Sequence, residues 1–133
     1  MQTGILVDYD IKQLIRENFI SFEKECDDKQ LQPASLDLRL GYKAYRVRAS
    51  FLPGLHNKVT QKLKTLQMHE IDLQQGAVFE CGCVYIVPLL EHVLLPEHIH
   101  ALANPKSSTG RLDIFTRLIT DCGEEFDKVA QGY

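Results

Sequence analysis

Four side chains within one short stretch, Lys106, Ser107, Ser108 and Arg111, have the chemistry of a phosphate site. Hydroxyls and cations are the groups that hold phosphate oxygens, and arginine can do so with two parallel hydrogen bonds. Pro105 prevents a helix from entering the stretch, so we expect a helical turn just after it, with Ser107 or Ser108 as its N-cap. The free N–H groups at the start of this helical turn would point at the same small volume as the hydroxyls and the cations. The alternative is a capped surface turn with two solvated cations, because short motifs recur by chance.

The cysteines and histidines do not form a second chemical site in the sequence. The pair Cys81-Gly82-Cys83 is tighter than the C-x-x-C spacing of zinc and redox sites, which predicts reduced and partly buried thiols. His98 and His100 would share one side of a strand, but no third metal ligand lies near them in the sequence. Solvated or hydrogen-bonded histidines are therefore expected.

Length and charge limit the class of protein. The chain has 133 residues, which predicts a single domain, residues 1–133, able to bury a core without disulfides. The net charge of −3 gives no general attraction to nucleic acid or to anionic membranes, so an anion site must be local. We expect a cytoplasmic protein, since the sequence shows neither a signal peptide nor an apolar run of about 20 residues.

The elements that would position these residues are mainly short strands. In the first half, Asp8 or Asp10 is expected to cap a short helix whose apolar face holds Ile11, Leu14 and Ile15. Alternation predicts strands at 35–40 and 44–48 with a possible turn at 41–43, followed by a loop at 51–57 and a short helix at 58–66.

The second half is expected to contain more strands than helices. Apolar runs indicate strands at 68–73, 77–79, 84–87 and 99–103, the last leading directly into the phosphate-type turn. Many short strands with frequent glycine and proline turns favour a mainly β protein, an antiparallel barrel or sandwich.

Three segments resemble one family in the same order along the chain. The stretch 32–41, QPASLDLRLG, looks like the early strand signature of dCTP deaminases and the related dUTPases. The stretch 106–112, KSSTGRL, resembles their phosphate motif, usually written R-S-S-x-x-R-x-G. Gly132-Tyr133 resembles the start of a later glycine–aromatic segment. The likeness is greatest to a longer bacterial form of dCTP deaminase that holds two such modules in one polypeptide.

The resemblance implies a fold and a reaction. It implies a distorted antiparallel β-barrel of the dUTPase-like type with a short N-terminal helix, assembled as a homotrimer with sites at subunit boundaries. It implies binding of dCTP or dUTP with Mg²⁺ carried by the triphosphate, and hydrolytic deamination of cytosine without zinc. The sequence agrees with the last point, because the H-x-E and P-C-x-x-C patterns of zinc deaminases do not occur in it. Neither nucleic acid nor membrane is expected as a partner.

The resemblance also assigns residues. Ser107, Ser108 and Arg111 match the phosphate contacts, and Lys106 stands where arginine is usual. Lysine keeps the charge but loses the bidentate fork. The base pocket would include Ile119, Thr120, Asp121 and Tyr133, with residues 118–121 reading the base through their backbone.

Two further positions depart from the family pattern. Asp113 replaces a glycine, and Ala130 stands where an aspartate is expected. Asp127 is a possible substitute for that aspartate.

The catalytic group of the family is a glutamate expected beyond Tyr133, so no catalytic residue is assigned in this chain. None of its other candidate glutamates matches that position: Glu70, Glu80, Glu91, Glu97, Glu124 and Glu125. One carboxylate must activate water and then protonate the leaving ammonia. We therefore expect an incomplete N-terminal part of a dCTP deaminase, inactive when isolated. Two alternatives stay open: a dUTPase-type pyrophosphatase, and a non-catalytic module that binds nucleotides or only assembles subunits.

Overall fold

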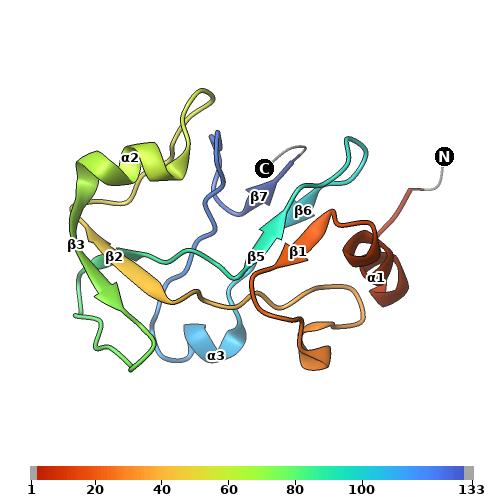
Figure 1. Ribbon diagram of the computed structural model, residues 1–133, viewed down its shortest axis with the longest axis horizontal. Coiled ribbons are helices and arrows are strands. Elements are labelled where there is room, and N and C mark those ends of the chain that lie inside the picture. The colour runs from red at the N-terminus through yellow and green to blue at the C-terminus, as the bar shows by residue number, and fades with distance from the viewer. Residues whose placement is uncertain (1–2, 131–133) are drawn as a thin grey trace.

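The structure, a computed structural model, describes residues 3–130 (Figure 1). Among these residues, seven short strands form three separate antiparallel sheets, in the orders β1-β5, β3-β2-β4 and β6-β7. The protein is therefore mainly β with a short N-terminal helix, as the sequence predicts. Long irregular segments join these elements.

Helix α1 (Asp8–Arg16) forms because apolar residues recur on one of its faces. Ile11 and Leu14 on that face are buried, and Arg16 on the other side is exposed. The predicted N-cap is wrong, since Val7 occupies that position. The Asp10 carboxylate instead accepts a hydrogen bond from the Val7 N–H (3.0 Å), which satisfies a donor that the helix leaves free.

The main core joins the two ends of the chain. Strand β1 (Ile20–Phe22) pairs with β5 (Glu91–Val93), and β6 (Ala101–Leu102) pairs with β7 (Lys128–Val129). The buried cluster takes one or two residues from each of several segments: Ile11, Leu14, Ile20, Leu95 and Val129. Figure 1 shows these elements gathered on the side of the molecule that carries α1.

A second group of elements lies on the other side of the molecule in Figure 1. Strand β2 (Lys43–Val47) is the centre of the sheet and pairs with β3 (Gln67–Asp72) and β4 (Val84–Ile86). Helix α2 (Val59–Leu66) buries Leu63 and runs directly into β3. These elements confirm the predicted strands near 44–48, 68–73 and 84–87 and the predicted helix at 58–66.

The stretch 35–40 is extended but does not form the predicted strand. It pairs only through the isolated bridges Leu31–Leu36 and Leu40–Leu89. The reason is that the Arg39 N–H donates to the Glu91 carboxylate (2.8 Å) instead of to a backbone carbonyl, while Pro88 has no N–H to give. Gly41 then donates to the Pro88 carbonyl (2.7 Å), so 41–43 is not a hairpin turn.

Two other expectations fail among the described residues. The run 77–79 belongs to none of the three sheets; Val78 is exposed, and Phe79 stacks on Tyr85 with ring centroids 4.3 Å apart. The predicted barrel is not closed within residues 3–130, since the three sheets share no strand. Short strands separated by prolines and side-chain hydrogen bonds do not continue a ladder around a barrel.

The part of the chain that the structure describes contains no helix long and apolar enough to cross a membrane.

Candidate functional site

The four residues predicted to hold phosphate lie together on one exposed turn. Helix α3 (Ser107–Gly110) has Lys106 as its N-cap, with φ −66° and ψ 144°, so the prediction of Ser107 or Ser108 at that position is wrong. The Lys106 carbonyl takes the helical hydrogen bond from the Thr109 N–H (3.0 Å), which leaves the serine N–H groups at the open end of the turn. Both serines and Arg111 are exposed.

Lys106 connects the two longest family-like segments. Its Nζ lies 2.5 Å from Asp37 Oδ2, and Asp37 belongs to the stretch 32–41. The lysine side chain is 62% exposed and the aspartate side chain 27%. By contrast, Arg111 forms no ion pair with any residue between 3 and 130.

The buried residue Gln30 holds the segment that carries Asp37 through both the N–H and the carbonyl of the Asp37 backbone. The Asp37 N–H donates to the Gln30 carbonyl (2.8 Å), and the Gln30 side-chain amide donates to the Asp37 carbonyl (2.9 Å). The Asp37 carboxylate therefore projects from a backbone position that is held at both its donor and its acceptor.

A buried carboxylate, Glu91, anchors the same segment. Its side chain is 0% exposed and accepts hydrogen bonds from Arg39 Nε (2.8 Å), the Arg39 N–H (2.8 Å) and the Gln30 amide (2.9 Å). The remaining Arg39 nitrogens donate to the Lys24 and Glu25 carbonyls at 2.7 and 3.0 Å. Because every member is satisfied, this network has a structural role. The sequence did not reveal it, since no local pattern joins residues 52 positions apart.

The stretch predicted to read the base lies elsewhere. Ile119, Thr120 and Asp121 are half-buried. The Asp121 carboxylate accepts a hydrogen bond from the Val59 N–H (2.7 Å), where it satisfies a free donor at the start of α2. In Figure 1, α2 and α3 lie at opposite edges of the molecule. Between residues 3 and 130, the single chain therefore does not bring the predicted phosphate groups together with Ile119, Thr120 and Asp121.

Asp127 has a structural function in the segment that leads to this stretch. Its carboxylate accepts hydrogen bonds from Arg117 Nη1 (2.6 Å) and the Leu118 N–H (2.7 Å). Its carbonyl accepts the Ala103 N–H (2.8 Å). Ala130, where the resemblance led us to expect an aspartate, is half-buried. Gly132 and Tyr133 lie outside the described residues, so the predictions made for them stay predictions.

The departure at Asp113 has a backbone explanation. Asp113 has φ 56°, in the left-handed region that favours glycine and that aspartate tolerates better than most residues. Beside it lies a cavity of about 220 Å³, lined by Pro105, Gly110 and residues 113–117. Phe115 in this wall is 98% exposed, which makes the surface next to α3 unusually apolar.

Two of the candidate glutamates, Glu70 and Glu80, form ion pairs away from α3. Glu70 lies 2.6 Å from Lys43 and Glu80 lies 2.9 Å from Arg46, both on the β3-β2-β4 side of the molecule. The hydrogen bond from Lys43 to Glu70 raises the pKa of the lysine. Neither carboxylate faces the phosphate-type turn.

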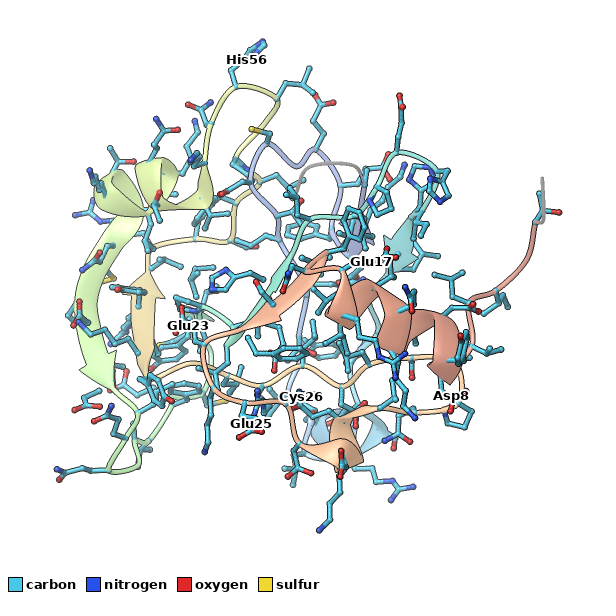
Figure 2. The ribbon with its side chains drawn as sticks, turned by 45° about the vertical axis from the view of Figure 1, so that its right-hand side comes forward. Asp8, Glu17, Glu23, Glu25, Cys26 and His56 are labelled. Carbon is cyan, nitrogen blue, oxygen red and sulfur yellow. The ribbon has the colours of Figure 1, made fainter. Side chains whose placement is uncertain are left out.

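The four cysteines are free thiols; Cys26, Cys83 and Cys122 are half-buried, as predicted, but Cys81 is exposed. Burial raises the pKa of the Cys26 thiol. Figure 2 shows Cys26 beside Glu25 on the segment after β1. Between residues 3 and 130, no three His, Cys, Asp or Glu side chains are grouped as metal ligands would be.

Comparison with known proteins confirms the family that the sequence resembles. The sequence pattern of the family described as "2′-deoxycytidine 5′-triphosphate deaminase (DCD) N-terminal domain" matches residues 2–133. The chain is 32% identical over 115 residues to "dCTP deaminase, dUMP-forming" of Methanothermobacter thermautotrophicus, covering 84% of this chain and 57% of the relative. It is 26% identical over 120 residues to "dCTP deaminase" of Haemophilus influenzae, covering 85% and 62%.

A solved structure is also similar over the whole chain. The crystal structure of 2′-deoxycytidine 5′-triphosphate deaminase from Agrobacterium tumefaciens has 59% sequence identity and a TM-score of 0.95, over 100% of this chain and 40% of that one. The chain thus spans little more than half the length of its curated relatives and less than half of this structure. The match over residues 2–133 shows that the chain belongs to the family of dCTP deaminase N-terminal domains.

Proposed function

We propose that this chain is the N-terminal part of a dCTP deaminase, which converts dCTP and water to dUTP and ammonia without zinc. The observation that carries the proposal is the exposed turn at α3, which presents two serines and an arginine with no ion pair among residues 3–130, in a chain of this family. Hydroxyls and a guanidinium in that arrangement suit a triphosphate.

In this proposal Ser107, Ser108, Lys106 and Arg111 bind the phosphate chain. Mg²⁺ would be held by the phosphates and water, its usual ligands beside nucleotides. The ion would neutralise part of the phosphate charge, while the protein groups fix the position of the nucleotide.

We further propose that a complete site forms between subunits of a homotrimer. The phosphate-type turn and the stretch 119–121 lie at opposite edges of one chain, so one subunit would contribute each part. Exposed apolar side chains in the segment after α3 suit such an interface: Leu112, Ile114 and Phe115. The same assembly, with residues beyond those described, would complete a dUTPase-like barrel.

Deamination needs a carboxylate that this chain is not expected to supply. Attack at C4 requires a base for the water and then an acid for the departing ammonia. Glu70 and Glu80 form ion pairs away from α3, and Glu91 is buried in the Arg39 network. We propose that the reacting glutamate comes from the part of the parent protein after Tyr133, in line with the relatives' greater length.

Product analysis tests the proposal. The full-length parent protein, given dCTP and Mg²⁺, should release ammonia, and the 133-residue chain should release none above the uncatalysed rate. General acid–base catalysis typically raises the reaction rate 10²–10⁴-fold. Phosphate binding alone stabilises the ground state and the transition state equally, so it does not speed the chemical step. Rapid turnover by the 133-residue chain would place the catalytic carboxylate within it and contradict the proposal.

Pyrophosphate measured in the same assay tests the second candidate, a dUTPase-type pyrophosphatase. Some of the relatives are named as dUMP-forming deaminases, which favours asking whether phosphate cleavage accompanies deamination. Pyrophosphate from dUTP without ammonia from dCTP would favour the second candidate. Binding of either nucleotide without any product from the full-length protein would favour a non-catalytic module.

A further inference from the structure

We propose that Asp37 is a positioning residue for the phosphate chain, which it serves by holding the Lys106 ammonium in place at the start of α3. This inference rests on the proposed function, since it assigns a role within the same phosphate site. It starts from the ion pair between Lys106 Nζ and Asp37 Oδ2 at 2.5 Å, which joins residues 69 positions apart.

The two partners of this pair differ in how firmly they are held. Lys106 is 62% exposed and has a long flexible side chain, whereas Asp37 is 27% exposed and short. The Asp37 backbone is bound at both its N–H and its carbonyl by buried Gln30. Gln30 in turn donates to buried Glu91, which also holds Arg39. The aspartate is therefore the fixed partner and the lysine the group that it orders.

Holding the lysine still leaves it able to bind an anion. An ammonium group has three donors, and the Asp37 contact uses one of them, so two can face a phosphate. A free lysine would lose rotamer freedom when it bound the nucleotide, and a lysine ordered in advance loses less. Ordering the side chain in advance matters more for lysine than for arginine, because lysine has no planar group that fixes the direction of its hydrogen bonds.

Binding measurements on the full-length parent protein test this role. We expect Asp37→Asn to weaken dCTP binding about three- to tenfold, the cost of ordering one long side chain. In a Lys106→Ala background, Asp37→Asn should cause no further loss, because the group that it positions is gone. Asp37→Glu keeps the charge and should bind within about twofold of wild type, as a longer carboxylate can still reach the ammonium. Isothermal titration with dCTP and Mg²⁺ measures all of these affinities, and inorganic triphosphate repeats them for the phosphate contacts alone.

A matched control removes a carboxylate from another exposed ion pair. Glu70→Gln breaks the pair with Lys43 (2.6 Å) on the β3-β2-β4 sheet and should leave dCTP binding unchanged. Thermal melting of each variant shows whether the fold is kept. Asp37→Asn retains both backbone hydrogen bonds to Gln30, so its melting temperature should stay near that of wild type.

The outcomes separate this inference from the proposed function. If Arg111→Ala and Lys106→Ala weaken binding but Asp37→Asn does not, the positioning role is wrong and the phosphate site stands. Tighter binding by Asp37→Asn in both backgrounds would show that the carboxylate only repels the anion, which also overturns the role. If Arg111→Ala, Lys106→Ala and Asp37→Asn all bind as wild type does, the phosphate site itself is misplaced.

Discussion

Arg111 and Lys106 both carry a positive charge on the α3 turn, but their surroundings differ. Arg111 forms no ion pair among the described residues, whereas Lys106 is paired with Asp37. An unpaired guanidinium can give both of its parallel hydrogen bonds to a phosphate, while a paired ammonium has part of its charge already balanced.

We expect Arg111→Ala to cost more nucleotide affinity than Lys106→Ala. The loss for Arg111 should be on the order of 2–5 kcal/mol if the nucleotide buries the charged contact. Titration of the full-length protein with a non-hydrolysable dCTP analogue measures it. Arg111→Lys is the matched variant, because it keeps the positive charge but cannot form two parallel hydrogen bonds. It should therefore recover part of the affinity that Arg111→Ala loses. Equal affinities for wild type and Arg111→Ala would remove this turn from the site.

Cys26 and Cys81 offer a comparison of thiols in different environments. Burial raises the pKa of Cys26, whereas Cys81 is exposed. A raised pKa means a smaller thiolate fraction at any pH below it, and the thiolate is the form that reacts. At pH 8 iodoacetamide should therefore label Cys81 well before Cys26, and the rate at Cys26 should still increase as the pH is raised toward its pKa. Peptide mass spectrometry over a time course measures both rates, and Cys26 labelled first would contradict the assignment.

Among the elements, strand β5 contains Glu91, the buried residue on which the packing of its neighbours depends. Glu91 is the buried acceptor that ties β5 to the segment 36–41 and, through Arg39, to the carbonyls after β1. An extended segment with only isolated bridges needs such side-chain links, because it lacks the regular hydrogen bonds of a ladder.

Glu91→Ala should lower the free energy of unfolding by about 3–5 kcal/mol, because it leaves the Arg39 guanidinium without its partner beside a buried Gln30 amide. Urea unfolding followed by circular dichroism measures the change. Glu70→Gln, which breaks an exposed pair, is the control and should leave the urea midpoint nearly unchanged. A Glu91→Ala midpoint equal to that of wild type would show that the network contributes nothing.

At the level of the whole molecule, the positions of α2 and α3 decide how a site can be built. The phosphate-type turn and the Asp121 stretch lie at opposite edges of one chain in Figure 1. Two such half-sites can act together only if another subunit supplies the second half, which is the arrangement that we propose.

Mixing two inactive proteins tests that arrangement. Arg111→Ala in one full-length protein and loss of the proposed glutamate after Tyr133 in another should each abolish turnover. Subunits exchanged between the two should regain part of the ammonia release, because some boundaries then combine an intact turn with an intact glutamate. Each variant mixed with itself is the control. No recovery after exchange confirmed by native mass spectrometry would place both groups on one subunit.

The sequence alone was enough to find the features that depend on neighbouring residues. The apolar spacing of Ile11 and Leu14 predicted α1, alternation predicted β2, and an apolar run predicted β3. Pro105 predicted the start of α3 to within one or two residues. The order of the three motifs predicted the family that the match over residues 2–133 shows. Each element and each single motif depends on a pattern that can be read within about ten residues.

Only the tertiary structure decided which groups meet. The pairs Asp37–Lys106 and Arg39–Glu91 join positions 69 and 52 residues apart, and Asp121 bonds to Val59 across 62. The stretch 35–40 alternates as a strand does, yet a glutamate side chain takes the hydrogen bond of one of its N–H groups. Local periodicity reports which side of a segment faces the core. It does not report which distant side chain will satisfy a backbone donor, because that choice depends on the packing of the whole chain.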